Sequence, residues 1–251
     1  MLFKDGQPSE GMAKIVEVTP VRLKNPVLIE GFPGVGMVGT IAATHIVKEL
    51  NMELVGYIDS DKFPPFCSIH NGTPLPPARL YQSKKHNLIV LLSEFVIPLG
   101  AVNEVTHEII SWSEDRKVRA VFSLGGIGIG GSEKKVFGVA TTSELKSSLE
   151  KSGVTIINEG VTTGVTGLLL SNAFLRKFPA ASILTTSKDV NVNLIGAANV
   201  LEKLGKILGI SFNAKTLEME GIELENRIKD LLKNTETAKK KYEEIESPMY
   251  R

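Results

Sequence analysis

The amino-acid sequence predicts a three-layer α/β/α protein, in which helices cover both faces of a mostly parallel or mixed central sheet. Short apolar runs of strand length alternate with longer segments of helical spacing along most of the chain. Glycine-rich turns follow three of the expected strands. With 251 residues, of which 42% are apolar, the chain is long enough to bury a large core as one α/β domain. These observations are typical of strands and helices that alternate around one sheet.

The first expected unit begins with the apolar run Val27-Leu28-Ile29, which predicts a buried strand. Glycines and a proline end this run, and residues 41–50 resume with the spacing of a helix. Residues 53–59 predict the next strand. A strand, a glycine-rich turn and a helix in this order predict the opening of a βαβ unit, and the other elements are arranged around it.

The glycine-rich turn of this unit allows two interpretations. Residues 34–39 fit the pattern G-x-G-x-x-G, and Asp59 ends the next strand roughly 20 residues later, as in a dinucleotide-binding fingerprint. In that fingerprint the first glycine ends the strand directly, whereas here Phe32 and Pro33 intervene. We therefore favour a structural role, in which the glycines let a helix pack closely on a strand, over a phosphate-binding role.

The other elements follow from the same patterns. Further strands are expected at residues 14–18, 88–93, 120–124, 136–141, 155–158 and 182–186. Further helices are expected at residues 102–118, 143–151, 168–177 and 193–208. Ser143 is expected to cap the second of these helices, and Gly209 to end the last. Because proline cannot donate to a strand ladder, the proline-rich residues 63–77 predict an irregular excursion with a hairpin turn at Asn71-Gly72.

The composition changes near residue 214, and we divide the chain there. Residues 1–213 form the expected α/β domain, residues 214–246 a C-terminal helical extension, and residues 247–251 a flexible, extended tail. Seven residues of the extension recur at alternating spacings of four and three: Leu224, Ile228, Leu231, Thr235, Ala238, Tyr242 and Ile245. This seam predicts one long helix, which lies either on its own domain or against another subunit. Pro248 ends any such helix.

Charge and cysteine content exclude several classes of protein. Lys and Arg number 29 and Asp and Glu 28, so the formal charge of +1 gives no field that attracts nucleic acid or anionic lipid. The single cysteine, Cys67, excludes an internal disulfide and suits a reducing cytosol. The first residues lack the apolar core of a signal peptide, and the longest apolar runs are too short to span a bilayer. We expect a cytoplasmic protein without nucleic-acid or membrane partners.

Chemistry, if present, is expected at the turns 31–39, 125–131 and 160–167, because small ligands bind at the carboxyl edge of doubly wound sheets. Reactive side chains are scarce there. The four histidines show no metal-ligand spacing: His45, His70, His86 and His107. Val121 stands where a nucleophile elbow around Ser123 needs a glycine. Four acidic residues are candidates that nothing in the sequence pairs: Glu30, Glu94, Glu159 and Asp189. We predict no catalytic residue, no metal site and no cofactor.

Three motifs together resemble the proteasome assembly chaperone family, in its archaeal branch. They are EGFPGVGMVG at residues 30–39, LGG at residues 124–126 and GVTGLLL at residues 164–170. The first motif is specific, because it accounts for the Phe32-Pro33 that the dinucleotide interpretation leaves unexplained. The resemblance covers residues 15 to about 210 and implies an α/β fold similar to that of purine nucleoside phosphorylases, without an established active site.

The resemblance implies a non-enzymatic, cytoplasmic protein that binds the α subunits of the proteasome core particle, as an assembly chaperone or an ATP-independent activator. The last three residues, Met249, Tyr250 and Arg251, match the hydrophobic-Tyr-any residue (HbYX) ending with which several proteasome partners dock between α subunits. The helical seam predicts a homo-oligomer. The sequence leaves open whether a paralogous chaperone joins the complex. The alternative hypothesis is an enzyme or sensor that binds a small molecule, with a nucleotide as first candidate, at the glycine-rich edge.

Overall fold

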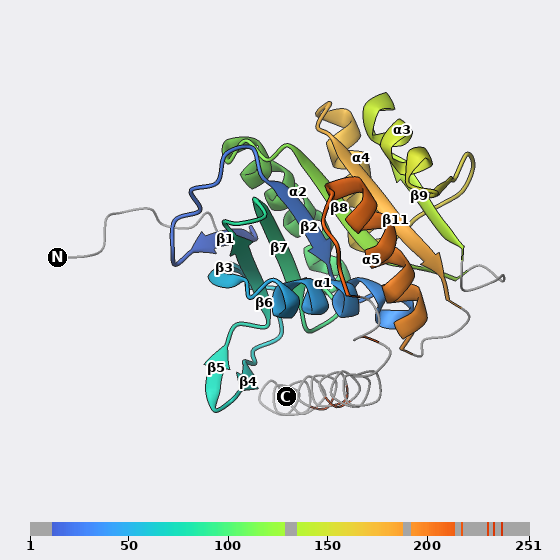
Figure 1. Ribbon diagram of the computed structural model, residues 1–251. Helices are drawn as coiled ribbons and strands as arrows, with labels where there is room; N and C mark the ends of the chain where they lie inside the picture. The colour runs from blue at the N-terminus through green and yellow to red at the C-terminus, as the bar shows by residue number, and fades with distance from the viewer. Residues whose placement is uncertain are drawn as a thin grey trace, which may run out of the picture.

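A nine-stranded sheet crosses the molecule, and helices cover both of its faces (Figure 1). The computed structural model describes residues 12–128, 135–187 and 192–213, together with Leu217, Asp230, Lys233 and Thr237. The predicted three-layer arrangement is confirmed. The sheet is mixed: parallel strands form its centre, and antiparallel neighbours flank them.

The strands stand in the order β1-β3-β6-β7-β2-β8-β11-β9-β10. In chain order they are β1 (Lys14–Glu17), β2 (Val27–Gly31), β3 (Glu53–Asp59), β6 (Ala78–Ser83), β7 (Leu88–Ser93), β8 (Ala120–Ile127), β9 (Val136–Ala140), β10 (Thr155–Ile156) and β11 (Ala180–Thr186). The central strands β7, β2, β8 and β11 run parallel to one another. Their carboxyl ends therefore meet at one edge of the sheet.

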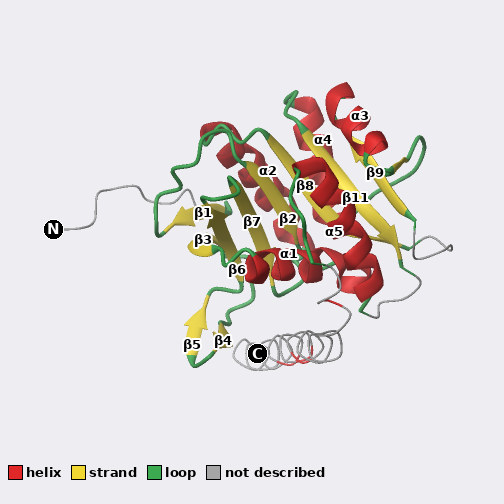
Figure 2. Cartoon of the chain, in the orientation of Figure 1, coloured by secondary structure: helices red, strands yellow, loops and turns green. Residues whose placement is uncertain are grey.

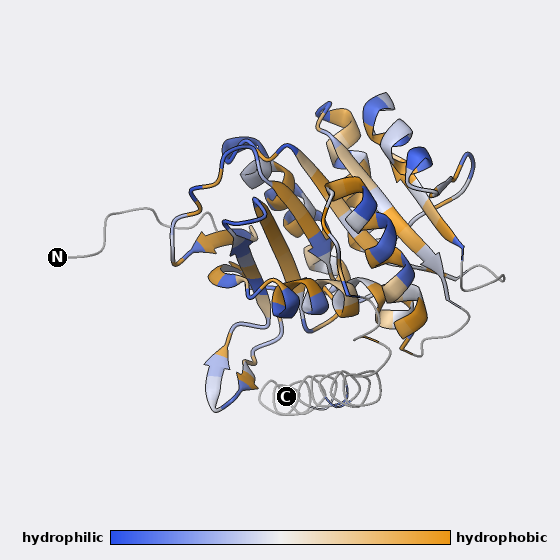
Figure 3. Cartoon of the chain, viewed as in Figure 1, coloured by the Kyte–Doolittle hydropathy of each residue, from blue (hydrophilic) through white to orange (hydrophobic). Residues whose placement is uncertain are grey.

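The helices divide between the two faces (Figure 2). α1 (Val38–Glu49), α3 (Ser143–Lys151) and α5 (Leu194–Leu208) contribute apolar side chains to the core on one face, which we call the α1/α5 face. α2 (Leu99–Asp115) and α4 (Gly164–Leu175) contribute to the core on the other, the α2/α4 face. A short 3₁₀ turn, η1 (Val35–Met37), leads into α1. Apolar residues concentrate in the central strands, as expected for strands buried on both sides (Figure 3).

Strand alternation decides which face each residue of β2 serves. Val27 and Ile29 belong to the core of the α1/α5 face, and Leu28 belongs to the core of the α2/α4 face. Since successive side chains of a strand point to opposite faces, Glu30 lies on the same face as Leu28. A carboxyl group is thereby placed among apolar residues, near the end of a strand whose five residues are all buried.

Several predicted boundaries require correction. α2 begins at Leu99, directly after Pro98, three residues before the predicted start. It ends at Asp115, and the backbone φ of Lys117 is +52°, a left-handed value that stops a helix. The N-cap of α3 is Thr142, whose hydroxyl accepts the N–H of Leu145, and not Ser143 as predicted. The prediction for α5 is confirmed, because Gly209 ends it at a φ of +69°.

The proline-rich segment contains the predicted hairpin. β4 (Ser68–His70) and β5 (Thr73–Leu75) pair antiparallel, and Asn71 and Gly72 form the turn between them, both at positive φ. This hairpin stands apart from the main sheet (Figure 1). The sequence analysis missed β6, which follows directly and pairs with both β3 and β7.

Most of the predicted C-terminal extension and all of the predicted tail lie outside the described residues. None of the seven seam residues is among those described. Leu217 is described and is buried in the core of the α1/α5 face. Within the described part of the chain, no helix combines the length and the apolar character that crossing a membrane requires.

Candidate functional site

The described residues of the three glycine-rich turns surround one cavity of about 640 Å³ at the carboxyl edge of the sheet. β2 and β8 contribute their final residues to its wall, and the first residues of α4 lie against it. Apolar residues from outside the turns also line it, among them Val96, Ile97, Val102, Val139 and Leu184. The described residues of all three turns do line one cavity, as expected. The third turn, however, does not follow a carboxyl end at this edge, because β10, which precedes it, runs antiparallel to the central strands.

Three polar residues form a row across neighbouring strands beside this cavity. Glu30 on β2 pairs with Ser123 on β8, and Ser123 pairs with Ser182 on β11. Paired residues of parallel strands share a face, so all three side chains lie on the α2/α4 face. Each is at most 2% exposed. Glu30 and Ser182 line the cavity.

A chain of hydrogen bonds connects Glu30 to the cavity wall. The N–H of Phe32 donates to Oε1 of Glu30 at 2.7 Å, and the hydroxyl of Ser123 donates to Oε2 at 2.5 Å. Oγ of Ser123 also lies 2.8 Å from Oγ1 of Thr166, which lines the cavity from α4. When Glu30 is ionised, Ser123 gives it its one hydroxyl hydrogen, and Thr166 then donates to Ser123. In that state the Thr166 oxygen can accept a further hydrogen bond.

The charge of Glu30 is poorly compensated. Burial raises the pKa of the Glu30 carboxyl to about 7, against the opposing effect of the hydrogen bonds from Ser123 and Phe32. Both of these donors are neutral. A carboxyl group whose pKa lies near neutrality, in a cavity, is a recurrent property of binding and catalytic sites.

Two glycines of the first turn, Gly36 and Gly39, serve packing, as the favoured interpretation requires. Gly36 has a φ of +67°, and a Cβ built on it would lie 2.6 Å from Oγ of Ser187. A Cβ on Gly39 would lie 2.2 Å from the carbonyl oxygen of Leu124 on β8. Side chains at these two positions would therefore push α1 and η1 away from the sheet.

The position of Asp59 contradicts the dinucleotide fingerprint. That fingerprint needs the acidic residue at the end of the strand beside the one that precedes the glycines. Here β6 and β7 stand between β2 and β3, so Asp59 lies three strands away from the glycine-rich turn.

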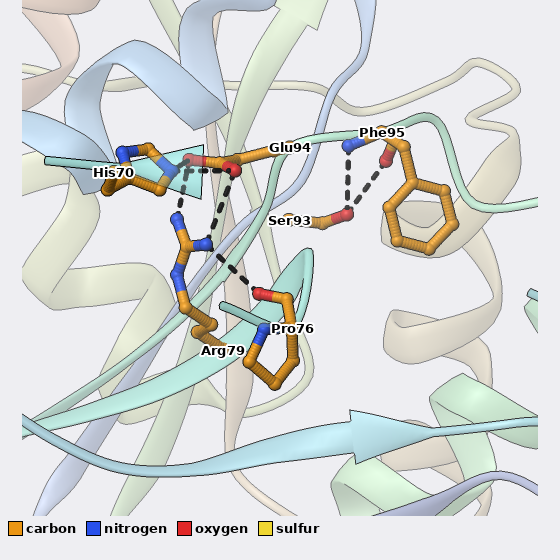
Figure 4. A network of polar contacts seen from close by, with 6 residues as sticks. All are labelled: His70, Pro76, Arg79, Ser93, Glu94 and Phe95. Atoms are coloured by element: carbon orange, nitrogen blue, oxygen red, sulfur yellow. Dashed lines mark hydrogen bonds and ion pairs between the residues drawn. The ribbon is translucent and has the colours of Figure 1, made fainter. Parts of the chain in front are cut away.

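Of the other candidate residues of the sequence, Glu159 lines the cavity in an exposed position. Glu94 bonds to Arg79 and His70 away from the cavity (Figure 4), and Asp189 lies outside the described residues. Nε2 of His45 lies 2.8 Å from a carboxylate oxygen of Glu49. Within the described ranges no cluster of three or more His, Cys, Asp or Glu side chains could hold a metal ion.

The candidate residues of the sequence included neither Thr166 nor Ser182. One signal could have found Ser182: it is a polar residue inside an apolar strand, as Glu30 and Ser123 are. Thr166 lies within the expected turn at residues 160–167 and the motif at residues 164–170, but nothing in the sequence distinguishes it there, because a threonine in the first turn of a helix is ordinary. The predicted docking residues Met249, Tyr250 and Arg251 lie outside the described residues.

The fold and the site define a three-layer α/β protein with a mixed sheet and a cavity at its carboxyl edge. The chain belongs to the PAC2 family, which matches residues 28–232. Two proteins of Methanocaldococcus jannaschii are similar to it. MJ0106 is 36% identical over 94% of this chain and 98% of its own length. MJ1210 is 30% identical over 88% of this chain and 87% of its own length.

Solved structures of Pyrococcus furiosus proteins are also similar. PbaA, described as an archaeal homolog of proteasome-assembly chaperone, is 34% identical with a TM-score of 0.80, covering 90% of this chain and 99% of PbaA. PbaB, described as an archaeal proteasome activator, is 25% identical with a TM-score of 0.73, covering 88% of this chain and 99% of PbaB. The fold expected from the resemblance is confirmed.

Proposed function

We propose that this protein binds the α ring of the proteasome core particle through its C-terminal residues, as an assembly chaperone or an ATP-independent activator. The observation that carries the proposal is the likeness to PbaA and PbaB over nearly their whole lengths, since both are described in terms of the proteasome. The ending Met249-Tyr250-Arg251 supports it independently, because it fits the HbYX pattern.

The chemistry of the tail suits a pocket between subunits. Pro248 restricts the residue before it to extended geometry, which separates the tail from a preceding helix. Met249 can fill an apolar groove, and Tyr250 can bury its ring while the hydroxyl finds a partner. In this proposal Arg251 supplies a terminal carboxylate to a lysine of the pocket.

The energetics of such a tail call for several copies. Burying the two side chains contributes roughly 3 to 5 kcal/mol, and a charge-assisted hydrogen bond adds about 1.5 to 3 kcal/mol. Association costs at least about 4 kcal/mol, and ordering the tail costs more. One tail should therefore bind weakly, whereas several tails on one oligomer bind together with useful affinity.

The tail is tested by comparing the full-length protein with a variant that lacks residues 249–251. Binding to the intact core particle and to free α subunits is measured by surface plasmon resonance. Deletion and Tyr250→Ala should remove binding, whereas Tyr250→Phe, which keeps the ring, should retain part of it. Circular dichroism and sedimentation check that fold and mass are unchanged. If the truncated protein binds as tightly as the full-length one, the body of the domain carries the contact instead.

Self-association is part of the same proposal and is tested separately. The seam of the C-terminal extension supplies the apolar stripe that a helix needs to meet a second copy. Ile228→Asp combined with Leu231→Asp should lower the mass found by sedimentation equilibrium. An unchanged mass would place the seam on its own domain, and a monomeric wild type would end the proposal of a multivalent binder.

The proposal assigns no reaction to the protein. The serine that contacts the Glu30 carboxylate is Ser123, which is fully buried behind Thr166 and is not among the described residues that line the cavity. Its hydroxyl is already engaged by Glu30 and Thr166. A nucleophile must reach its substrate, and in this geometry a molecule in the cavity does not reach Ser123. The shielding of Ser123 supports a non-enzymatic role.

A further inference from the structure

We propose that the cavity at the carboxyl edge binds a small uncharged molecule with an apolar body and an amide-like group that both donates and accepts hydrogen bonds. This inference goes beyond the proposed proteasome function and concerns a different part of the chain. It rests on the charges, the hydrogen-bonding groups and the apolar side chains of the cavity walls.

The charges of the wall disfavour anionic ligands. The charged side chains among the described lining residues are Glu30 and Glu159, and those residues include no Lys, Arg or His. A phosphate or carboxylate placed here would meet acidic groups without a basic partner, at a cost that burial increases. The nucleotide that the sequence analysis held as an alternative is therefore a poor match, and an uncharged ligand is a better one.

The hydrogen-bond chain from Glu30 makes Thr166 an acceptor. At pH 8, above the pKa of about 7, Glu30 is ionised and can only accept. Ser123 then donates to Glu30, and Thr166 donates to Ser123. Thr166 lines the cavity and its hydroxyl hydrogen is then used by Ser123, so it can only accept from an N–H or O–H group on the ligand.

Donors for the ligand come from two other places. The first N–H groups of α4, a 12-residue helix that begins at Gly164, have no acceptor within the helix, and the side chain of Thr163 does not cap them. Ser182 supplies a second, independent sign of a ligand. Its side chain is fully buried, it lines the cavity, and its hydroxyl has no hydrogen-bond partner among the described residues. A buried hydroxyl without a partner is costly, and a ligand that accepts from it would remove that cost.

The remaining walls fit an apolar body. Val96 and Ile97 come from the segment that leads into α2, Val102 comes from α2 itself, and Val139 and Leu184 come from the strands β9 and β11. The volume of about 640 Å³ lies within the range of small-molecule sites, which are mostly apolar with a few placed polar groups.

Benzamide and benzoate form a matched pair of probes, because they share a ring and differ in charge. Each is titrated into the ¹⁵N-labelled full-length protein at pH 8, and amide shifts are followed by NMR. Benzamide should give saturable shifts confined to residues 124–126 and 163–167. Benzoate and ATP should give none there. Benzamide without effect, or benzoate or ATP binding in the cavity as tightly, would overturn the proposal.

Two variants connect the binding to the proposed groups. Thr166→Val keeps the shape of the side chain and removes its hydroxyl, so it should weaken benzamide binding about threefold to tenfold. Thr155→Val, at an exposed position of β10, is the matched control and should leave it unchanged. Equal affinity in wild type and Thr166→Val would contradict the proposed contact. A variant without residues 249–251 should bind benzamide normally, so this test and the proteasome test fail independently.

Discussion

Glu30 and Glu94 lie at the carboxyl ends of the neighbouring strands β2 and β7, yet their surroundings differ. Glu30 is 2% exposed and the side chain of Glu94 is 9% exposed. The Glu94 carboxylate accepts from Arg79 at 2.5 Å and from His70 at 2.9 Å (Figure 4). Among the described residues, Glu30 accepts only from the neutral donors Phe32 and Ser123. Within that part of the chain, one buried acid has a cation beside it and the other has none.

The pKa values of the two carboxyl groups move in opposite directions. Burial would raise the pKa of Glu94, but the hydrogen bonds and the charge of Arg79 outweigh it and the pKa is lowered. Burial prevails at Glu30 and raises its pKa to about 7. The charge of the Glu94 carboxylate is thus balanced by Arg79. The buried Glu30 carboxyl has no cationic partner among the described residues, which is why we assign binding to its surroundings.

The Glu94 cluster has a structural task instead. His70 belongs to the hairpin strand β4, Arg79 to β6, and Glu94 follows β7. Arg79 also donates to the carbonyl oxygen of Pro76, at the base of the hairpin. Its side chain is 3% exposed. The ion pair therefore ties the projecting hairpin to the sheet.

The largest expected effect comes from removing the cation of this cluster. Arg79→Ala leaves the Glu94 carboxylate buried without its partner and should lower the free energy of unfolding by about 3 to 5 kcal/mol, as measured by urea denaturation. Arg79→Met combined with Glu94→Leu should recover much of this loss, because it removes both charges. A loss below about 1 kcal/mol for Arg79→Ala would show that water reaches Glu94 and that the two glutamates differ less than described.

Glu30 should give a pH dependence of the opposite kind. Between pH 4.5 and about 7 the unfolded chain ionises at this residue while the folded protein keeps its proton, so stability falls as pH rises. The total loss is about 3 kcal/mol and is complete above pH 7. The lowered pKa of Glu94 instead costs stability as pH falls below 4.5.

Glu30→Gln separates this contribution from all others. The amide can still accept from Phe32 but carries no charge. The free energy of unfolding of the variant, relative to that of the wild type, should therefore rise from pH 4.5 to 7 and stay constant above pH 7. Urea unfolding at several pH values gives the difference. Parallel stability curves for variant and wild type would show that Glu30 titrates alike in the folded and unfolded chains.

The same contrast explains what could be predicted from the sequence. Apolar periodicity located β2, β7, β8 and β11, because each is buried on both faces. It missed β6, in which the polar residues Arg79 and Gln82 are buried. Their partners, Glu94 and Glu53, lie 15 and 29 residues away in sequence. Burial of a polar residue depends on such distant partners, which a local pattern does not contain.

The polar contacts of the candidate site could not be predicted from the sequence, because their partners are also distant along the chain. The hydrogen bond between Ser123 and Glu30 spans 93 residues, and the one between Ser123 and Thr166 spans 43. The sequence did place the glycine-rich turns at strand ends, so the edge that carries the cavity was predictable. Which polar side chains meet there depends on strand order, and two strands, β6 and β7, stand between β2 and β3.

The turn that follows Glu30 should tolerate a side chain at one glycine and not at another. Gly36→Ala places a Cβ against Ser187 at a φ of +67° and should cost about 1 to 3 kcal/mol. Gly34→Ala is the matched control, because nothing lies within 4 Å of its Cβ and its φ is −153°. Thermal unfolding compares the two. Equal losses would mean that chain flexibility, and not packing, sets the need for glycine at this edge.

The smallest expected effect concerns one hydroxyl from each region. Ser93 donates to the carbonyl oxygen of Phe95 at 2.7 Å, close to Glu94 (Figure 4). The buried hydroxyl of Ser182, in contrast, has no partner in the described part of the chain. Ser93→Ala should cost about 1 to 3 kcal/mol, because it leaves polar groups of Phe95 unpaired. Ser182→Ala should be neutral or stabilise the ligand-free protein by up to about 1 kcal/mol, because it removes an unpaired hydroxyl. Urea denaturation of both variants measures the difference. If Ser182→Ala lowers the free energy of unfolding as much as Ser93→Ala does, the Ser182 hydroxyl already has a hydrogen-bond partner in the ligand-free protein. If Ser182→Ala is more stable than the wild type and also binds benzamide more weakly, the Ser182 hydroxyl lowers the stability of the ligand-free protein and contributes to ligand binding.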